Sequence, residues 1–319
     1  MKVIEHIQQA AALDKGPQFS FEIVPPARGK SVKEIIDIAE TLTQLNPAWI
    51  DVTSHASSAY FHERQDGVIE KKTFKKRPGT LGICGIIQNR FKIDTVAHIL
   101  CLGFSKEETE DALIELNFLG IHNVLALRGD YPNYQKEFAK NRSLNVYASD
   151  LVAQIKDLRE GKFSEETNDA APLDFCVGIA GYPEKHIEAA NLKTDVKNLK
   201  LKVDRGADFI CTQMFFDNEK YFSYKQACIE AGIKIPIVPG LKVLKSASQL
   251  KSLPKTFHID LPDGLVDEVS ESPAHASEIG KRWAIKQVES LIAAGEKNIH
   301  FYIMNDATEV VQIAKHFLK

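Results

Sequence analysis

The sequence predicts an α/β fold, a single (β/α)8 TIM barrel with loop insertions that spans residues 1–319. Three observations lead to this prediction. The chain has 319 residues, enough for one barrel of roughly 250 residues with insertions. Eight short apolar runs are typical of strands, and most are separated by stretches with helical spacing. Buried strands that alternate with amphipathic helices predict a parallel sheet covered by helices, and eight such units suggest closure into a barrel.

The first predicted strand, Phe19–Val24, carries the most informative local pattern. Its aromatic and aliphatic residues alternate with polar ones, and Pro25 and Pro26 end it because neither has an N–H to donate to a ladder. Glu22 therefore lies two residues from the end of a strand, on the face opposite the phenylalanines. In a barrel, the carboxyl end of a strand is where chemistry takes place. Taken alone, the segment favours an ordinary solvated glutamate near a strand end.

The other strands are predicted from similar short apolar runs. They are Trp49–Thr53, Thr95–Cys101, Asn123–Leu127, Phe175–Ala180, Phe209–Phe215, Pro236–Leu241 and Asn298–Met304. Helices are expected between them because apolar residues recur three and four positions apart. One such stripe is Ile35, Ile36, Ala39, Leu42 and Leu45, and another is Leu192, Val196, Leu199 and Val203.

Three stretches are longer than a simple barrel needs. Residues 61–92 contain a mostly basic cluster, 70–77, which we expect to be a solvated surface, followed by a helix through Ile83 and Ile86. Residues 162–171 are predicted to be a polar loop insertion. Residues 255–278 are expected to form an extended excursion before the last helix and strand.

Composition and charge exclude several classes of protein. The net charge of -3 and the pI near 6.4 give no global attraction for nucleic acid or acidic membranes. No apolar run reaches the roughly 18 residues of a membrane span, and Met1–Gln18 has no signal-peptide core. The five cysteines form no Cys-x-x-Cys pair, so we expect reduced core residues in a cytoplasmic protein and no metal site. The chain lacks a Walker loop and a G-x-G-x-x-G motif.

Polar residues follow six of the predicted strands and would meet at one face of a barrel. After the fourth strand, Arg128 could grip a phosphate, Gly129 allows close approach of the backbone, and Asp130 could accept a hydrogen bond from a ring N–H. A turn with a surface ion pair is the alternative. Tyr182 and His186 lie four residues apart and would share a helix face if one helix spans them. The corresponding polar segments are Glu22, 51–55, His98, 128–130, 181–186 and 212–217.

Several of these motifs occur together and in order along the chain. They are Phe21-Glu22-x-x-Pro25-Pro26, Leu125-Ala126-Leu127-Arg128-Gly129-Asp130, Tyr147-Ala148-Ser149-Asp150-Leu151, Gly181-Tyr182-Pro183-Glu184-x-His186, Thr212-Gln213-Met214-Phe215-Phe216-Asp217 and His300-Phe301-Tyr302. With this set, the chain resembles methylenetetrahydrofolate reductases of the short, bacterial type, from about Phe19 to its end.

The resemblance implies a barrel that binds FAD at the carboxyl ends of its strands and has no regulatory domain. NADH or NADPH would reduce the flavin and leave. Methylenetetrahydrofolate would then accept the hydride in a ping-pong mechanism, giving methyltetrahydrofolate for methionine synthesis. We expect these small molecules as partners, a homo-oligomeric state, and no nucleic acid or membrane. The resemblance leaves open which nicotinamide is preferred, and whether another electron donor feeds the flavin.

The same resemblance assigns roles to individual residues. Glu22 would be the general acid that helps open the folate imidazolidine ring to the iminium ion, and Asp130 would lie by the flavin pyrimidine edge and reach the pterin. Gln213 and Gln249 match positions that hold folate or nicotinamide. The positions that match FAD contacts are Thr53, Ala56, His98, Arg128, Gly129, Asp130, Tyr147, Ala148, Tyr182, His186, Asp195, Asn198 and Lys202.

The chain also departs from the family pattern. Ser54 and His55 replace a common Tyr-Gly pair, and Leu201 stands where an arginine is frequent, which leaves Lys202 as the expected phosphate partner. Asp306 stands where an arginine commonly helps to hold the folate. Either Lys242 or Lys245 then supplies the cation, or the folate binds differently.

Two other functions remain open from the sequence. One keeps the barrel but uses Lys242, after the seventh strand, for Schiff-base aldol catalysis through a lysine of lowered pKa. The other is a non-catalytic scaffold that binds folate or flavin.

Overall fold

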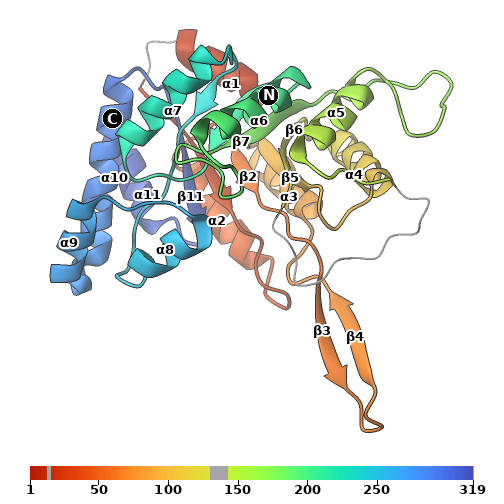
Figure 1. The fold of residues 1–319 in the computed structure, drawn as a ribbon, viewed down its shortest axis with the longest axis horizontal. Helices are drawn as coiled ribbons and strands as arrows, with labels where there is room; N and C mark the ends of the chain where they lie inside the picture. The colour runs from red at the N-terminus through yellow and green to blue at the C-terminus, as the bar shows by residue number, and fades with distance from the viewer. Residues whose placement is uncertain (13–15, 130–142, 319) are drawn as a thin grey trace.

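The fold is a parallel barrel surrounded by helices, seen in a computed structural model that describes residues 1–12, 16–129 and 143–318 (Figure 1). One sheet contains nine parallel segments in the order β10-β11-β1-β2-β5-β6-β7-β8-β9. These are β1 (Gln18–Ile23), β2 (Ile50–Val52), β5 (Thr95–Leu100), β6 (Asn123–Leu127), β7 (Cys176–Gly181), β8 (Phe209–Thr212), β9 (Ile237–Val238), β10 (Gly240–Leu241) and β11 (Asn298–Met304).

The sheet closes through Pro239. The two segments at its ends, β9 and β10, are consecutive in the chain; β9 pairs with β8 and β10 pairs with β11. Because proline has no N–H, the ladder is interrupted at this residue, but its carbonyl oxygen accepts a hydrogen bond from His300 N at 2.9 Å. Together β9 and β10 form the seventh of eight barrel strands, so the predicted (β/α)8 barrel is confirmed.

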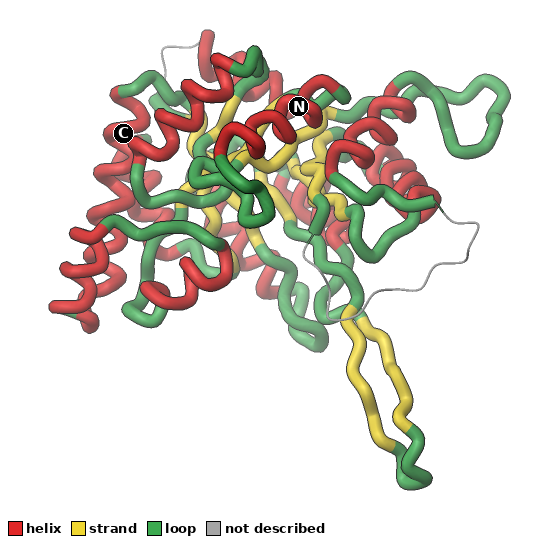
Figure 2. The backbone as a smooth tube through the Cα atoms, in the orientation of Figure 1, coloured by secondary structure: helices red, strands yellow, loops and turns green. Residues whose placement is uncertain are grey.

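Helices cover the outside of the barrel, as Figure 2 shows. Phe19, Phe21 and Ile23 of β1 point into this outer layer and are buried with Ile35 and Leu42. Both predicted helical stripes are confirmed. The barrel helices are α2 (Lys33–Thr43), α3 (Thr80–Phe91), α4 (Lys106–Phe118), α5 (Ala148–Arg159), α6 (Leu192–Asp204), α7 (Asn218–Glu230), α10 (Ala276–Ala293) and α11 (Thr308–Phe317).

The first helix, α1 (Val3–Ala12), covers the amino-terminal end of the barrel. Val3 is buried in one apolar cluster with the interior residues Trp49, Leu125 and Phe209, and its N–H donates to Asn123 Oδ1 at 2.8 Å. Since the indole of Trp49 also meets Phe209 edge-on, large side chains fill this end. A ligand site is therefore expected at the opposite end of the barrel. We call this end the mouth: the carboxyl ends of the strands and the loops that follow them.

A two-stranded ribbon extends away from the barrel after β2 (Figure 1). It consists of β3 (Ser58–Glu63) and β4 (Ile69–Phe74), paired antiparallel, and most of its side chains are exposed. The basic cluster lies on and after β4, so its prediction as a solvated surface is confirmed. The strands themselves were not predicted, because a ribbon without a buried face shows no apolar alternation.

Shortening this ribbon is expected to leave the stability of the barrel nearly unchanged. Its strands contact mainly each other, so deleting residues 60–72 and joining Ala59 to Thr73, which are paired, through an Asn-Gly turn removes little buried surface. We expect the thermal unfolding midpoint to stay within about 3 °C of that of the full chain. Calorimetry of both chains measures it, and a drop of more than about 8 °C would mean that the ribbon supports the barrel.

The prediction of an extended excursion at residues 255–278 is wrong, because this region is helical. It contains the end of α8 (Gln249–Phe257), then α9 (Asp263–Glu271) and the short 3-10 turn η1 (Pro273–His275). Leu253, Leu265 and Val269 are buried in a separate apolar cluster beside the barrel. These helices are short and polar on their exposed faces, and Pro254 interrupts the helical pattern of the sequence. The predicted loop at 162–171 has neither helix nor strand.

Within the part of the chain that the structure describes, no helix combines the length and the apolar character needed to cross a bilayer.

Candidate active site at the barrel mouth

Six polar side chains lie inside the barrel toward its mouth, above the apolar residues that fill its lower part. We call this set the polar layer. Its members alternate along their strands with residues that face the outer helices, so they point to the barrel interior. They come from β1, β2, β5 and β11 and from the position after β10. They are Glu22, Asp51, His98, Lys242, His300 and Tyr302.

Glu22 lies at the centre of this layer. Its side chain is 13% exposed, and its Oε2 lies 3.6 Å from Nε2 of His98, which is beyond hydrogen-bond distance. Burial raises the pKa of Glu22 to about 8, against a smaller lowering effect of the Lys242 charge. Its carboxyl group is therefore protonated near neutral pH.

The neighbours of Glu22 are mostly neutral for the same reason. Burial lowers the pKa of both His98 and His300 to about 3, so both imidazoles are uncharged. Burial, together with the nearby Glu22, raises the pKa of Asp51 well above its usual value. Apart from the Lys242 ammonium group, Glu22 thus lies among groups that burial keeps uncharged or makes harder to ionise, an environment that favours its protonated form.

Lys242 and Tyr302 connect the layer to the seventh and eighth strands. The Lys242 ammonium donates to the Tyr302 carbonyl oxygen at 3.2 Å, and burial lowers the pKa of this lysine to about 8. The Tyr302 hydroxyl donates to the Thr212 carbonyl oxygen at 2.5 Å. These contacts join β8, β10 and β11, the strands around the point where the barrel closes.

The residues predicted to bind a flavin lie on one side of the mouth. Thr53 and Ala56 follow β2, His98 is in β5, Arg128 and Gly129 follow β6, and Tyr147 and Ala148 begin α5. Tyr182 and His186 follow β7, and Asp195, Asn198 and Lys202 lie in α6. Because β2, β5, β6 and β7 are adjacent in the sheet, the structure brings these residues together along half of the rim. Asp130, the other predicted catalytic residue, lies outside the described residues.

A network of hydrogen bonds organises the β7 side of this half. Tyr182 and His186 lie in the loop between β7 and α6, so one helix does not span them, but their rings meet edge-on with centroids 4.8 Å apart. The backbone N–H of His186 donates to Asp195 Oδ2 at 3.0 Å. Lys202 donates to the Ala180 carbonyl oxygen at 2.7 Å, and burial lowers its pKa to about 8. These contacts place a lysine and an imidazole at the rim.

Arg128 makes a two-pronged ion pair with Glu188. Its two terminal nitrogens lie 2.6 and 2.7 Å from the carboxylate oxygens, and this contact lowers the pKa of Glu188. The guanidinium group of Arg128 is thus held in the orientation that would suit a phosphate. A phosphate at this position would compete with Glu188.

Two buried polar atoms of the residues predicted to bind a flavin have no hydrogen-bond partner among the described residues. They are Oγ1 of Thr53 and Nε2 of His98. Buried polar atoms are normally paired, so such exceptions indicate a place for a ligand or ordered water. Gly129, with φ near +86°, adopts a conformation that favours glycine and brings the backbone to the rim.

The two predicted substrate residues lie away from this half. Gln213 follows β8, and its Oε1 accepts from the Met214 N–H at 2.9 Å. Gln249 begins α8, and its Oε1 accepts from the Lys245 N–H at 2.6 Å. Each amide oxygen is therefore satisfied by nearby backbone, and the amide nitrogens remain the groups with which these side chains could reach a ligand.

Asp306 is neutralised within the structure. Lys245 Nζ lies 2.8 Å from Asp306 Oδ2 and 2.5 Å from Glu309 Oε2. Hydrogen bonds from Lys245 and Thr308 lower the pKa of Asp306 to about 2. Lys245 is consequently paired with two carboxylates. Of the two lysines predicted to replace the arginine that commonly helps to hold the folate, Lys242 is the one without such a pair among the described residues.

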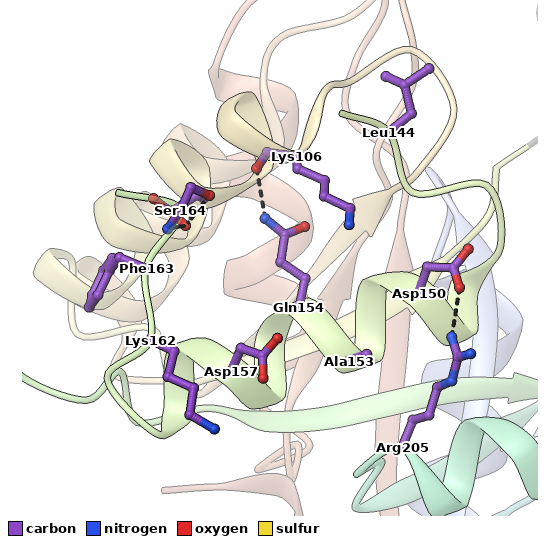
Figure 3. A pocket seen from close by; sticks show the side chains of 11 residues that line it. Lys106, Leu144, Asp150, Ala153, Gln154, Asp157, Lys162, Phe163, Ser164 and Arg205 are labelled. Carbon is purple, nitrogen blue, oxygen red and sulfur yellow. Dashed lines mark hydrogen bonds and ion pairs between the residues drawn. The ribbon is translucent and has the colours of Figure 1, made fainter. Parts of the chain in front are cut away.

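A surface cavity of about 590 Å³ lies outside the barrel, between α4, α5 and the loop after α5 (Figure 3). Gln154 reaches the Lys106 carbonyl oxygen, and Arg205 pairs with Asp150 at 2.6 Å. None of the polar-layer residues lines this cavity. Among the described residues there is also no cluster of side chains that could hold a metal ion.

Sequence reasoning placed Asp51 only within the polar segment 51–55, and it missed the contributions of His300 and Tyr302 to the polar layer. Asp51 and His300 alternate with apolar residues along their strands, as Glu22 does, so the same signal marks them. The signal for Tyr302 is its place two residues after His300. The sequence pattern does not show that these side chains lie at a similar depth in the barrel.

Comparisons with known proteins agree on one family. The family model described as methylenetetrahydrofolate reductase matches residues 6–317. A 5,10-methylenetetrahydrofolate reductase of Pectobacterium carotovorum is 29% identical over 94% of this chain and 90% of its own length. The Escherichia coli enzyme of the same name is 29% identical over 90% of this chain and 86% of its own.

Two further matches complete the comparison. Methylenetetrahydrofolate reductase 1 of Schizosaccharomyces pombe is 32% identical over 90% of this chain, which spans 43% of that longer protein. A solved Clostridium thermocellum protein, titled as binding two copies of 5-methyl-5,6,7,8-tetrahydrofolic acid, superposes with a TM-score of 0.57 at 14% identity. It covers 97% of this chain and 98% of that one, and at this identity it supports the fold alone.

Proposed function

The chain belongs to the methylenetetrahydrofolate reductase family and is an enzyme of that class, and on this premise we propose its reaction. It reduces 5,10-methylenetetrahydrofolate to 5-methyltetrahydrofolate with FAD as cofactor and NAD(P)H as reductant, in a ping-pong mechanism. Glu22 is the general acid, and the product supplies methyl groups for methionine synthesis. The observation that carries the proposal is a buried, protonated carboxyl group at the mouth of the barrel.

The chemistry of the substrate requires such an acid. The bridging carbon of methylenetetrahydrofolate is bound to two ring nitrogens, and one of these C–N bonds must break before reduction. An amine leaves poorly until it is protonated, so a donor must be held within hydrogen-bond reach. Glu22 meets this need because burial raises its pKa to about 8. His98 and His300 are uncharged imidazoles near neutral pH, so neither holds the extra proton that a histidine acid would donate in place of Glu22.

The side of the rim formed by β2, β5, β6 and β7 fits the proposed cofactor. FAD, when bound, would supply the hydride chemistry, and the protein would supply position and charge. Arg128 and Lys202 would offset the pyrophosphate charge, and Thr53 and His98 have buried polar atoms without partners that a polar ring edge could satisfy. Gln213 and Gln249, on the other side, would hold folate or nicotinamide.

The most direct test measures the product. Purified chain is incubated with FAD, NADH or NADPH and methylenetetrahydrofolate, and methyltetrahydrofolate is quantified by mass spectrometry. We expect a yellow protein and nicotinamide-dependent product. A protein that stays colourless after FAD is added would refute the cofactor, and a borohydride-trapped carbonyl adduct at Lys242 would favour the aldol alternative.

The reaction is expected to lose rate as the pH rises through about 8. Glu22 donates a proton, so only its protonated form is active, and a raised pKa keeps that form populated up to about pH 8. Reoxidation of the reduced enzyme by methylenetetrahydrofolate is followed by stopped flow from about pH 6 to about pH 10. A rate that falls only below about pH 5, or rises with pH, would exclude Glu22 as the donor.

A further inference from the structure

Lys242 is a buried lysine that no step above employs. It directly follows β10, at the carboxyl end of the seventh barrel strand, and is 6% exposed. Lysine is rarely buried to this degree unless its charge is compensated. Its ammonium group donates a hydrogen bond to the backbone carbonyl oxygen of Tyr302 at 3.2 Å. A nearby group that can take on negative charge would therefore be stabilised by this ammonium group.

The strand register places Glu22 and this lysine at the same level, on the two strands that flank β11. Leu241 of β10 pairs with Phe301 of β11, so Lys242 stands next to Tyr302. On its other side, Tyr302 of β11 pairs with Glu22 of β1. The lysine and the glutamate thus flank one residue of β11 at the same depth in the barrel. The backbone hydrogen bond to Tyr302 holds the ammonium group at this depth.

Other titratable groups also face Glu22. Burial keeps the thiol of Cys211 and the phenol of Tyr302 protonated near neutral pH by raising the pKa of each well above its usual value. Burial and the nearby Glu22 raise the pKa of the Asp51 carboxyl group well above its usual value. Burial keeps His98 and His300 uncharged by lowering the pKa of each to about 3. Lys242 is the cationic group among those named here.

We propose that Lys242 is a positioning residue for the Glu22 acid: its ammonium group, held on the Tyr302 carbonyl, makes the buried Glu22 carboxyl group able to release its proton to the substrate. A buried acid without a cation holds its proton too tightly to be a good donor, because the carboxylate that remains is unstable there. The ammonium group stabilises this carboxylate. The role in proton donation to folate rests on the proposed function, whereas the interaction between ammonium and carboxyl groups does not.

The proposal is tested first without turnover. The titration of the Glu22 carboxyl group is followed by infrared difference spectroscopy of the cofactor-free protein, with Glu22→Gln to identify the signal. In Lys242→Met the midpoint is expected to rise by at least about one pH unit, since a nearby opposite charge is worth about 1–3 units. Lys242→Arg and the matched surface control Lys251→Met are expected to titrate as the wild type does. Coincident midpoints for wild type and Lys242→Met overturn the proposal.

A kinetic test then addresses the role in the reaction. The rate of folate reduction is expected to fall about tenfold in Lys242→Met, with its alkaline limb moved to higher pH, and to recover in Lys242→Arg. If Lys242 instead bound the folate, KM would rise while the pH profile stayed in place, which contradicts the proposal. If the wild type forms no methyltetrahydrofolate, the proposed function fails. The infrared titration still shows whether the Lys242 ammonium group interacts with the Glu22 carboxyl group. Should Lys242→Met not fold, Lys242→Gln, which keeps a donor for the Tyr302 carbonyl, takes its place.

Discussion

Replacing Glu22 with glutamine is expected to lower the rate of folate reduction by about 10²–10⁴-fold, the usual contribution of a general acid. Glutamine has nearly the same shape and fills the same space at the mouth, but its amide cannot deliver a proton to the leaving nitrogen. Reduction of the flavin by NAD(P)H requires no proton from Glu22 and is expected to continue. Stopped-flow measurement of the two half-reactions separates these effects.

Glu271→Gln is the matched control, because Glu271 is exposed at the end of α9. It makes the same chemical change far from the polar layer and should leave both half-reactions as they are. Two results would contradict the assignment. Unchanged folate turnover in Glu22→Gln would remove Glu22 from the acid role, and loss of both half-reactions would indicate a structural role instead.

Replacing Gly280 with alanine is expected to destabilise the protein by about 3 kcal/mol, as an overpacked core position does. Gly280 lies in α10, where alanine would ordinarily stabilise the helix by about 1 kcal/mol. Here a Cβ would overlap the carbonyl oxygen of Leu244 and lie 2.8 Å from its carbonyl carbon. Because these are backbone atoms, the helix itself would have to move away from the segment after β10.

Gly85→Ala is the control for this substitution. Gly85 also lies within a helix, α3, but its added Cβ would meet only the Leu119 side chain at 3.6 Å, an ordinary contact. We expect this variant to gain about 0.5–1 kcal/mol. Urea unfolding of the two variants beside the wild type gives both values. A stabilised Gly280→Ala protein would show that α10 packs less closely on Leu244 than described.

The barrel could be predicted because its strands are buried on both faces and therefore stand out as short apolar runs. The alternation in Phe19–Val24 and the two prolines after it gave the first strand to within one residue. The ribbon of β3 and β4 escaped prediction because neither of its faces is buried. Helices α8 and α9 escaped it because each is nine residues long and their apolar residues form a small cluster of their own.

The site was predictable only in part. Glu22 could be found from its place at a strand end, and burial then raises its pKa in the direction expected for an acid. Contacts between distant segments leave no local pattern, so neither the pair of Arg128 with Glu188 nor that of Lys245 with Asp306 could be foreseen. The neighbourhood of Lys242 and Glu22 likewise depends on the register of three strands, which only the closed barrel defines.

Because the ladder is interrupted at Pro239, the strand pairs of the barrel differ in how much free energy it costs to separate them. β1 and β11 pair at six positions, whereas β9 and β10 each pair at two. Local unfolding costs the least free energy where backbone hydrogen bonds are fewest. Amide protons at this seam should therefore exchange with solvent sooner than those between β1 and β11. Lys242 directly follows this seam. Local opening of the barrel would therefore change the surroundings of Lys242 and Glu22 before it separated β1 from β11.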